Sequence, residues 1–208
     1  MARPFTPALA ALALLASTAA VAEQRILTLD PGRSTVHFTL GATLHTVHGS
    51  APLAGGEVLF DTDGGDASGQ LEVDARRADT GNGKRDREMH DKVLLSARHP
   101  TAVLRVTRLE GRLPGVGSAT LTVRGTLGLL GRGHDLAVPV QVTVNGDQVT
   151  FEAELEVPYV DWGLHDPSSF LLKVDKFVTV TVSGAGTLAA PPAAAGPALG
   201  SAQQQPQP

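Results

Sequence analysis

Apolar and polar residues alternate with a period of two along most of the chain. The pattern is clear at Val36, Phe38 and Leu40, which are separated by His37 and Thr39. Successive residues of a strand point to opposite faces of a sheet, so this spacing predicts strands with one buried face. The same alternation recurs in segments 58–60, 71–75, 102–107, 120–124, 136–144, 149–157 and 177–182. We therefore expect an all-β protein of about eight or nine strands.

Turn residues separate the predicted strands. Asn145-Gly146 lies between the two longest alternating runs, and this dipeptide is the strongest short-range signal of a β-hairpin. The segment 61–66 is rich in Asp and Gly. It resembles a calcium loop only faintly, because the glycine expected at the sixth position is missing. We interpret it as a second hairpin turn.

One stretch departs from the strand pattern. Between Lys84 and Ala97, the apolar residues Met89, Val93 and Leu94 have helical spacing with charged residues between them, which predicts one short amphipathic helix. Many antiparallel strands with a single helix indicate a β-sandwich or a closed barrel. Closure removes exposed sheet edges, and an eight-stranded barrel is about wide enough to hold one small ligand.

The inner faces of the predicted strands consist almost entirely of Val, Leu, Ala and Phe, and the whole chain has one Trp and one Tyr. Side chains of this size could line an open tube, or they could form an ordinary packed core. The pattern alone favours the packed core.

The two ends of the chain differ in composition from the middle. Arg3 precedes the apolar run 8–16, and Ala20-Val21-Ala22 follows it. This is the layout of a secretory signal peptide over residues 1–22, and the apolar run is too short to cross a membrane as a helix. Residues 189–208 are rich in Pro, Ala and Gln and are expected to be disordered. We expect a folded domain over residues 23–188, in the periplasm or secreted.

Charge and cysteine content exclude several functional classes. The net charge of −4 gives no electrostatic footprint for nucleic acid or for an anionic membrane surface. The absence of cysteine excludes thiol catalysis, redox pairs and thiolate metal sites. No cofactor is predicted.

The histidines are the first candidates for chemistry. His45 and His48 are three residues apart, so on a strand they would face opposite sides and would not share a metal ion. The chain contains neither His-Glu-x-x-His nor Gly-x-Ser-x-Gly, which are the marks of zinc proteases and of many hydrolases. We predict no catalytic residues and no metal site. Two alternatives stay open: a structural or metal-buffering stress-response periplasmic protein, and a hydrolase whose Ser, His and Asp come from distant segments.

The densest polar cluster spans residues 79–90. Thr80-Gly81-Asn82-Gly83 cannot continue a strand, and the predicted helix starts just after it. The charged residues that follow could form a salt-bridged cap that fixes the helix over one barrel end. Alternatively, Arg85 or Arg87 could bind an anionic head group. The pattern favours the cap.

Several short motifs, in this order, resemble the YceI-like proteins. The resemblance rests on Asp30-Pro31 with Ser34-Thr35-Val36-His37-Phe38, on Thr80-Gly81-Asn82 with Arg85-Asp86 and Met89-His90, on His99-Pro100, and on Tyr159-Val160-Asp161-Trp162-Gly163-Leu164. It covers residues 27–182. It implies a closed, antiparallel, eight-stranded lipocalin-like barrel in the periplasm that holds a polyisoprenoid, a prenylated quinone or a similar amphiphile.

We therefore expect a protein that binds or transports a lipid-like ligand and is not an enzyme. No nucleic-acid partner and no stable membrane insertion are expected, and a homodimer is left open. The candidate wall residues are the large apolar ones on the inner faces: Phe38, Leu40, Phe60, Leu104, Leu121, Phe151 and Phe177. The candidate residues of the barrel mouth are His45, Arg85, Arg87 and His90.

Overall fold

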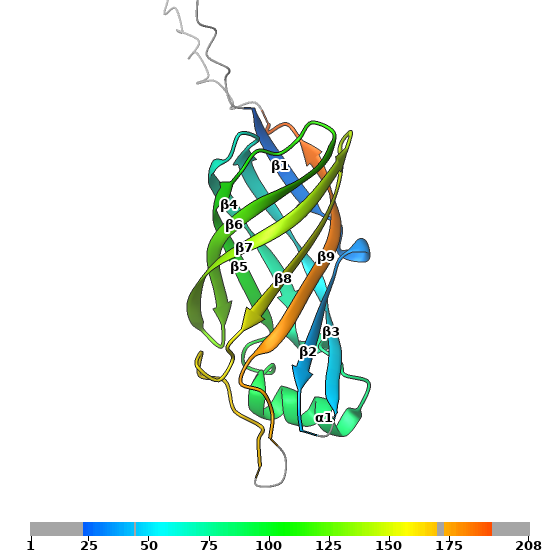
Figure 1. Cartoon of the computed structure of the whole chain (residues 1–208), viewed down its shortest axis with the longest axis vertical. Helices are drawn as coiled ribbons and strands as arrows, with labels where there is room; N and C mark the ends of the chain where they lie inside the picture. Colours follow the sequence, from blue (N-terminus) through cyan, green and yellow to red (C-terminus); the bar gives the residue numbers. More distant parts are fainter. Residues whose placement is uncertain (1–22, 44, 170–172, 193–208) are drawn as a thin grey trace, which may run out of the picture.

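The computed structural model describes residues 23–43, 45–169 and 173–192. The expected signal peptide and most of the expected tail lie outside this part of the chain. Nine antiparallel strands form one sheet (Figure 1). They are β1 Gln24–Leu29, β2 Thr35–Gly41, β3 Thr46–Asp61, β4 Gly65–Asp74, β5 Thr101–Glu110, β6 Gly117–Leu129, β7 Arg132–Asn145, β8 Gln148–Val157 and β9 Val178–Ala189.

The sheet closes into a barrel because β4 pairs with β3 as well as with β5. β1 and β2 share one position between β3 and β9. β2 pairs with the first half of β3, and β1 pairs with the second half. Pro31 interrupts the ladder between them, within the 3₁₀ turn η1 (Pro31–Arg33). The structure is thus an eight-stranded barrel with one extra strand, which confirms the fold expected from the sequence.

The predicted hairpin turns are present. β7 and β8 meet at Asn145-Gly146, where Gly146 has a φ of 61°, a left-handed conformation that glycine adopts without steric cost. β3 and β4 are joined across Thr62 to Gly64. The Gly64 N–H donates to the Asp61 carbonyl over 3.0 Å.

The predicted helix lies beneath one end of the barrel (Figure 1). α1 covers Gly83–Glu88, and one π-helical stretch continues it over Met89–Val93. The side chain of Asn82 caps its first turn by accepting from the N–H groups of Lys84 and Arg85, each over 3.1 Å. The helix ends four residues before the predicted Ala97, because Leu95 has a positive φ of 46°, which a right-handed helix cannot contain.

The two ends of the barrel differ. The upper end in Figure 1 carries the β3–β4, β5–β6 and β7–β8 connections. The lower end carries the β2–β3, β4–β5, β6–β7 and β8–β9 connections, with α1 in the β4–β5 connection. We call the lower end the mouth and the upper end the closed end.

Candidate ligand cavity

The barrel encloses a cavity of about 680 Å³, within the range of roughly 300–1,000 Å³ that small-molecule sites occupy. Its wall is formed by inward-facing apolar side chains from all nine strands. A packed protein interior leaves few voids larger than a water molecule. This barrel differs, because it holds the cavity and none of the described side chains is completely buried. The packed-core interpretation, which the sequence pattern favoured, is therefore wrong for the middle of this barrel.

The closed end, in contrast, is filled. A cluster of apolar side chains there is only 2–8% exposed: Val58, Phe60, Val106, Leu109, Leu113, Leu121, Val142, Val144, Val149 and Leu188. Leu113 comes from the β5–β6 connection, whose position is fixed by the Leu113 N–H donating to the Thr62 carbonyl over 2.8 Å. The cavity therefore has a solid floor.

Two phenylalanines of the wall lie against glycines of the neighbouring strand. Phe38 pairs in register with Gly49, and Phe151 pairs with Gly184. A Cβ atom at Gly49 would lie 2.2 Å from Cζ of Phe38, and one at Gly184 would lie 2.4 Å from Cζ of Phe151. Each ring occupies the space that a side chain at the glycine would need. The ring therefore lies over the neighbouring strand and projects less far into the cavity.

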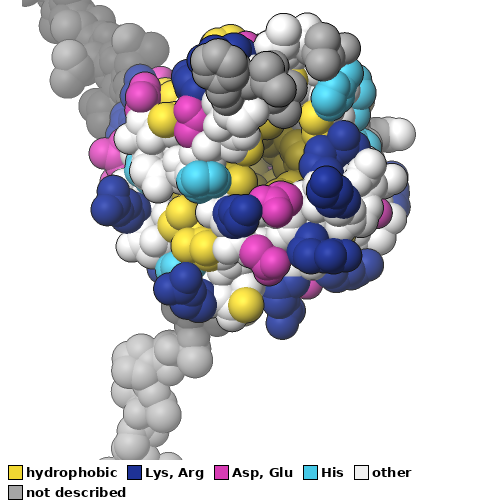
Figure 2. Space-filling model, turned by 90° about the horizontal axis from the view of Figure 1, so that it is seen from below, with side chains coloured by type: hydrophobic (Ala, Val, Ile, Leu, Met, Phe, Trp, Pro, Cys, Tyr) yellow, Lys and Arg dark blue, Asp and Glu magenta, His cyan; other side chains and the backbone are white. Residues whose placement is uncertain are grey.

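The mouth is an apolar hollow with a polar rim (Figure 2). Most residues that line the cavity are apolar, and the polar ones come from the connections at this end or from their edges. They are His45, Thr80, Arg85, Glu88, Lys92, Tyr159 and His165. An apolar chain would thus find polar partners only where it reaches the mouth.

Arg85 and Asp86 hold the start of α1 against the loop before it. Arg85 Nε donates to Thr80 Oγ1 over 2.8 Å, and its Nη2 donates to the Thr80 carbonyl over 2.9 Å. Asp86 Oδ1 accepts from the N–H of Thr80 over 2.9 Å and from its hydroxyl over 2.5 Å. The bond from the Thr80 hydroxyl is the main cause that lowers the pKa of Asp86. These contacts hold the start of the helix as the expected cap would, but through hydrogen bonds to Thr80 and not through the expected salt bridges. Arg85 also borders the cavity.

Glu88 and Lys92 form an ion pair on one helical face at the rim, with 2.6 Å between Nζ and Oε2. Lys92 lowers the pKa of Glu88 by hydrogen bonding, the largest cause. Both side chains are 56% exposed, so the pair is weak and can exchange for other partners.

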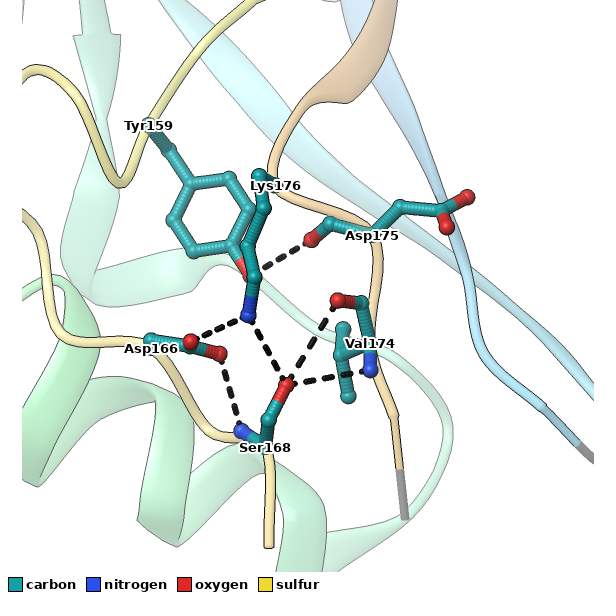
Figure 3. Close-up of polar contacts among 6 residues, drawn as sticks. All are labelled: Tyr159, Asp166, Ser168, Val174, Asp175 and Lys176. Atoms are coloured by element: carbon teal, nitrogen blue, oxygen red, sulfur yellow. Dashed lines mark hydrogen bonds and ion pairs between the residues drawn. The ribbon is translucent and has the colours of Figure 1, made fainter.

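The β8–β9 connection at the mouth is held by a polar network (Figure 3). Lys176 Nζ pairs with Asp166 and donates to Ser168 Oγ over 3.1 Å. The Ser168 N–H donates to Asp166 Oδ1 over 3.0 Å. Hydrogen bonding from Lys176 is the main cause that holds the pKa of Asp166 well below its ordinary value. Tyr159 donates its hydroxyl to the Asp175 carbonyl over 2.8 Å, which ties the start of the connection to its end.

A Ser–His contact joins the π-helical stretch to the residues that follow it. His90 Nδ1 is 2.9 Å from Ser96 Oγ, and its Nε2 is 3.0 Å from the Ala78 carbonyl. A carbonyl only accepts, so Nε2 carries a proton, and a neutral ring then accepts from the Ser96 hydroxyl at Nδ1. Ser96 is only 6% exposed and does not line the cavity. The contact therefore ties the π-helical stretch to the residues that flank it in the β4–β5 connection, and it offers no accessible nucleophile.

Most of the sequence-predicted residues meet in the cavity. Six wall candidates line it, namely Phe38, Leu40, Phe60, Leu104, Leu121 and Phe151, together with His45 and Arg85 at the mouth. Phe177, Arg87 and His90 do not line it. Phe177 is 46% exposed, because the alternation of β9 turns Val178, Val180 and Val182 inward and so turns residue 177 outward. Arg87 lies on α1 and is exposed.

Sequence reasoning missed five polar lining residues: Thr80, Glu88, Lys92, Tyr159 and His165. Glu88 and Lys92 are four residues apart within the predicted helix, so a helical wheel would have placed them on one face. Nothing in the local pattern signalled the other three, because they lie in turns and loops.

Two further searches cover only the part of the chain that the structure describes. Within it, no three His, Asp or Glu side chains lie close enough together to hold a metal ion. No helix in the described ranges is long and apolar enough to span a bilayer.

Comparison with protein families matches residues 27–185 to the YceI-like domain. Among solved structures, BcnA of Burkholderia cenocepacia is 18% identical with a TM-score of 0.63, over 77% of this chain and 99% of that chain. A polyisoprenoid-binding domain from Saccharophagus degradans, described as implicated in plant cell wall breakdown, is 19% identical with a TM-score of 0.61, over 79% and 98%. A YceI protein of Campylobacter jejuni is 13% identical with a TM-score of 0.51, over 67% and 80%. No curated protein matches.

Proposed function

The chain belongs to the YceI-like family, and from that premise we propose that its barrel binds a long apolar or amphiphilic molecule, such as a polyisoprenoid or a prenylated quinone, and carries it without catalysis. The observation that carries the proposal is the open cavity of about 680 Å³, whose wall is apolar from the rim down to the packed closed end. The polyisoprenoid-binding domain with the same fold supports the same class of ligand.

The size of the cavity fits one hydrocarbon chain. With about 30 Å³ for each water-sized group in a liquid, the volume holds on the order of 20 carbon-sized groups. Each buried CH₂ contributes roughly 0.8 kcal/mol, and the ordering of chain and ligand offsets part of that sum. A smooth apolar wall selects by length and girth, so chemical selection falls to the polar rim, where Arg85, Lys92 and His165 border the cavity.

The arrangement of polar groups favours a carrier over the hydrolase alternative. The wall between floor and rim offers no Ser, His or Asp side chain among the described lining residues. Ser96, which contacts His90, is buried. We further propose that the carrier works in the periplasm or outside the cell, as the expected signal peptide indicates.

The test is to purify the protein, extract it with organic solvent and identify the extract by mass spectrometry. We expect an isoprenoid or similar lipid in a fixed ratio to protein. Ala153 lines the cavity from β8, so Ala153→Trp should fill the space and deplete the lipid. Thr150→Trp is the matched control, because Thr150 is exposed on the same strand.

The control should keep its lipid and should melt like the parent protein. Protein that is folded, takes up no lipid and rejects added isoprenoids would refute the proposal. So would equal lipid content in Ala153→Trp and Thr150→Trp, since the lipid would then lie outside the cavity.

A further inference from the structure

Basic residues are concentrated at the mouth, although the whole chain is acidic. The β4–β5 connection, residues 75–100, contains seven Lys and Arg against four Asp and Glu, which gives it a net charge of +3. The other described residues contain nine Lys and Arg against 17 Asp and Glu, a net charge of −8. The net charge of the whole chain therefore conceals a basic β4–β5 connection. The β8–β9 connection at the same end, residues 158–177, has three Asp against two Lys, a net charge of −1.

Most of the basic side chains in this connection are available for an external partner. Arg77, Lys84, Arg87 and Arg98 are exposed, and none of them forms an ion pair with a described residue. Meanwhile the carboxylate of Asp86 is turned toward Thr80. Figure 2 shows Lys and Arg side chains gathered along one side of the hollow. We use the name basic rim for Arg77, Lys84, Arg87 and Arg98.

An exposed aromatic side chain lies at the same end. Phe177 is 46% exposed and directly precedes β9, whose first residue Val178 pairs with Val157 at the mouth end of β8. Binding to a bilayer surface is strengthened by buried apolar area and by the attraction of basic side chains to anionic lipids, and this end of the barrel offers both. The acidic stripe Glu152, Glu154 and Glu156 is exposed on the wall of β8, so an anionic surface would repel the side of the barrel.

We infer that the mouth of the barrel docks reversibly on an anionic lipid surface through the basic rim, with Phe177 entering the interface. The inference rests on the proposed function, because a lipid carrier gains from meeting the bilayer with its mouth. In this orientation an apolar ligand passes from lipid to cavity without exposing its chain to water. Each Lys or Arg near such a surface contributes about 1 kcal/mol, enough for a weak attachment that salt reverses.

The test is cosedimentation with phosphatidylcholine vesicles, with and without phosphatidylglycerol. The parent protein should bind only the anionic vesicles, and added salt should release it. Lys84→Gln with Arg87→Gln removes two charges of the basic rim and should weaken binding on the order of tenfold or more. Arg33→Gln with Arg105→Gln is the matched control, because it removes the same charge from exposed positions on the barrel wall. It should change binding by less than about twofold.

Equal binding to neutral and anionic vesicles, or equal loss in the two double variants, would overturn the inference. No binding to anionic vesicles would also overturn it, and would point instead to an acidic protein surface as the partner of the basic rim. The fluorescence of Trp162 and the co-extracted lipid, measured on each variant, show that the barrel is intact. An empty cavity in the parent protein would refute the proposed function alone, because the vesicle experiment does not require a bound lipid.

Discussion

One strand provides a matched pair of substitutions that tests whether the barrel is hollow. Leu121 and Leu127 both lie on β6, and both face inward. Leu121 is 3% exposed and belongs to the packed cluster at the closed end. Leu127 is half-buried and borders the cavity nearer the mouth. Leu121→Ala and Leu127→Ala remove the same atoms from the same strand but from different surroundings.

The expected costs differ because Leu121, which also borders the cavity floor, is tightly packed in the closed-end cluster, whereas Leu127 is only half-buried and has more open space around it. In a packed core, Leu→Ala loses the transfer free energy of the side chain and leaves a cavity, at a total cost of about 3–5 kcal/mol. Leu127 already borders empty space, so its truncation loses only part of the transfer free energy, about 1–2 kcal/mol. We therefore expect Leu121→Ala to destabilise the lipid-free protein by about 2 kcal/mol more than Leu127→Ala does.

The assay is urea unfolding of delipidated protein, followed by far-UV circular dichroism. Both variants should retain the parent dependence of the unfolding free energy on urea, so that the midpoints can be compared. Reloading with the extracted lipid should raise the cost of Leu127→Ala, since the side chain then loses contacts with the ligand. Equal costs in the lipid-free protein would mean that the wall around Leu127 is packed, and would refute the hollow barrel.

Three further outcomes follow from single contacts. Gly184→Ala should destabilise the barrel by about 1–3 kcal/mol and reduce lipid uptake, because the new Cβ would displace Phe151 into the cavity; parent-like uptake would contradict this. Burial raises the pKa of Tyr159 to about 12 from an ordinary value of 10.0. The folded state keeps that proton where the unfolded state loses it, so the unfolding free energy should fall from pH 10 upward. Tyr159→Phe should abolish that fall, and an unchanged slope in alkaline denaturation would be the contrary result. The ring of His134 stacks on Trp162 with centroids 4.1 Å apart, while its buried Nε2 has no hydrogen-bond partner among the residues that the structure describes. His134→Phe should keep the stack and raise the melting temperature, by about 1 kcal/mol in unfolding free energy; a lower melting temperature would show that Nε2 is satisfied in solution.

Alternation along the strands predicted much of the cavity wall. Phe38, Leu104 and Phe151 point inward as their parity requires, because the period of two is a local property of extended backbone. Phe177 was expected in the wall because it was grouped with Val178. Adjacent residues of a strand point to opposite faces, and Val178 is the one that points inward. The cap at Asn82 and the hairpin at Asn145-Gly146 were also predictable, since each depends on a few adjacent residues.

The polar rim was predicted only in part. His45 and Arg85 were identified, whereas Tyr159 and His165 reach the mouth from a connection about 80 residues away from α1. Their approach depends on the closure of the sheet between β3 and β4, which no local pattern encodes. The basic rim was missed for a different reason: the net charge of the whole chain averages the basic segment 75–100 with the acidic remainder.

The sequence by itself determined which residues face inward, where the chain turns, and which family's order of motifs it follows. Only the tertiary structure decided that the interior is open in the middle and filled at one end. A residue pattern specifies the chemistry of one wall, but the distance to the opposite wall depends on how many strands close the barrel and how they are staggered. The excess of Lys and Arg in residues 75–100 can be counted in the sequence, but only the tertiary structure places that connection at the mouth, away from the acidic stripe on the wall of β8.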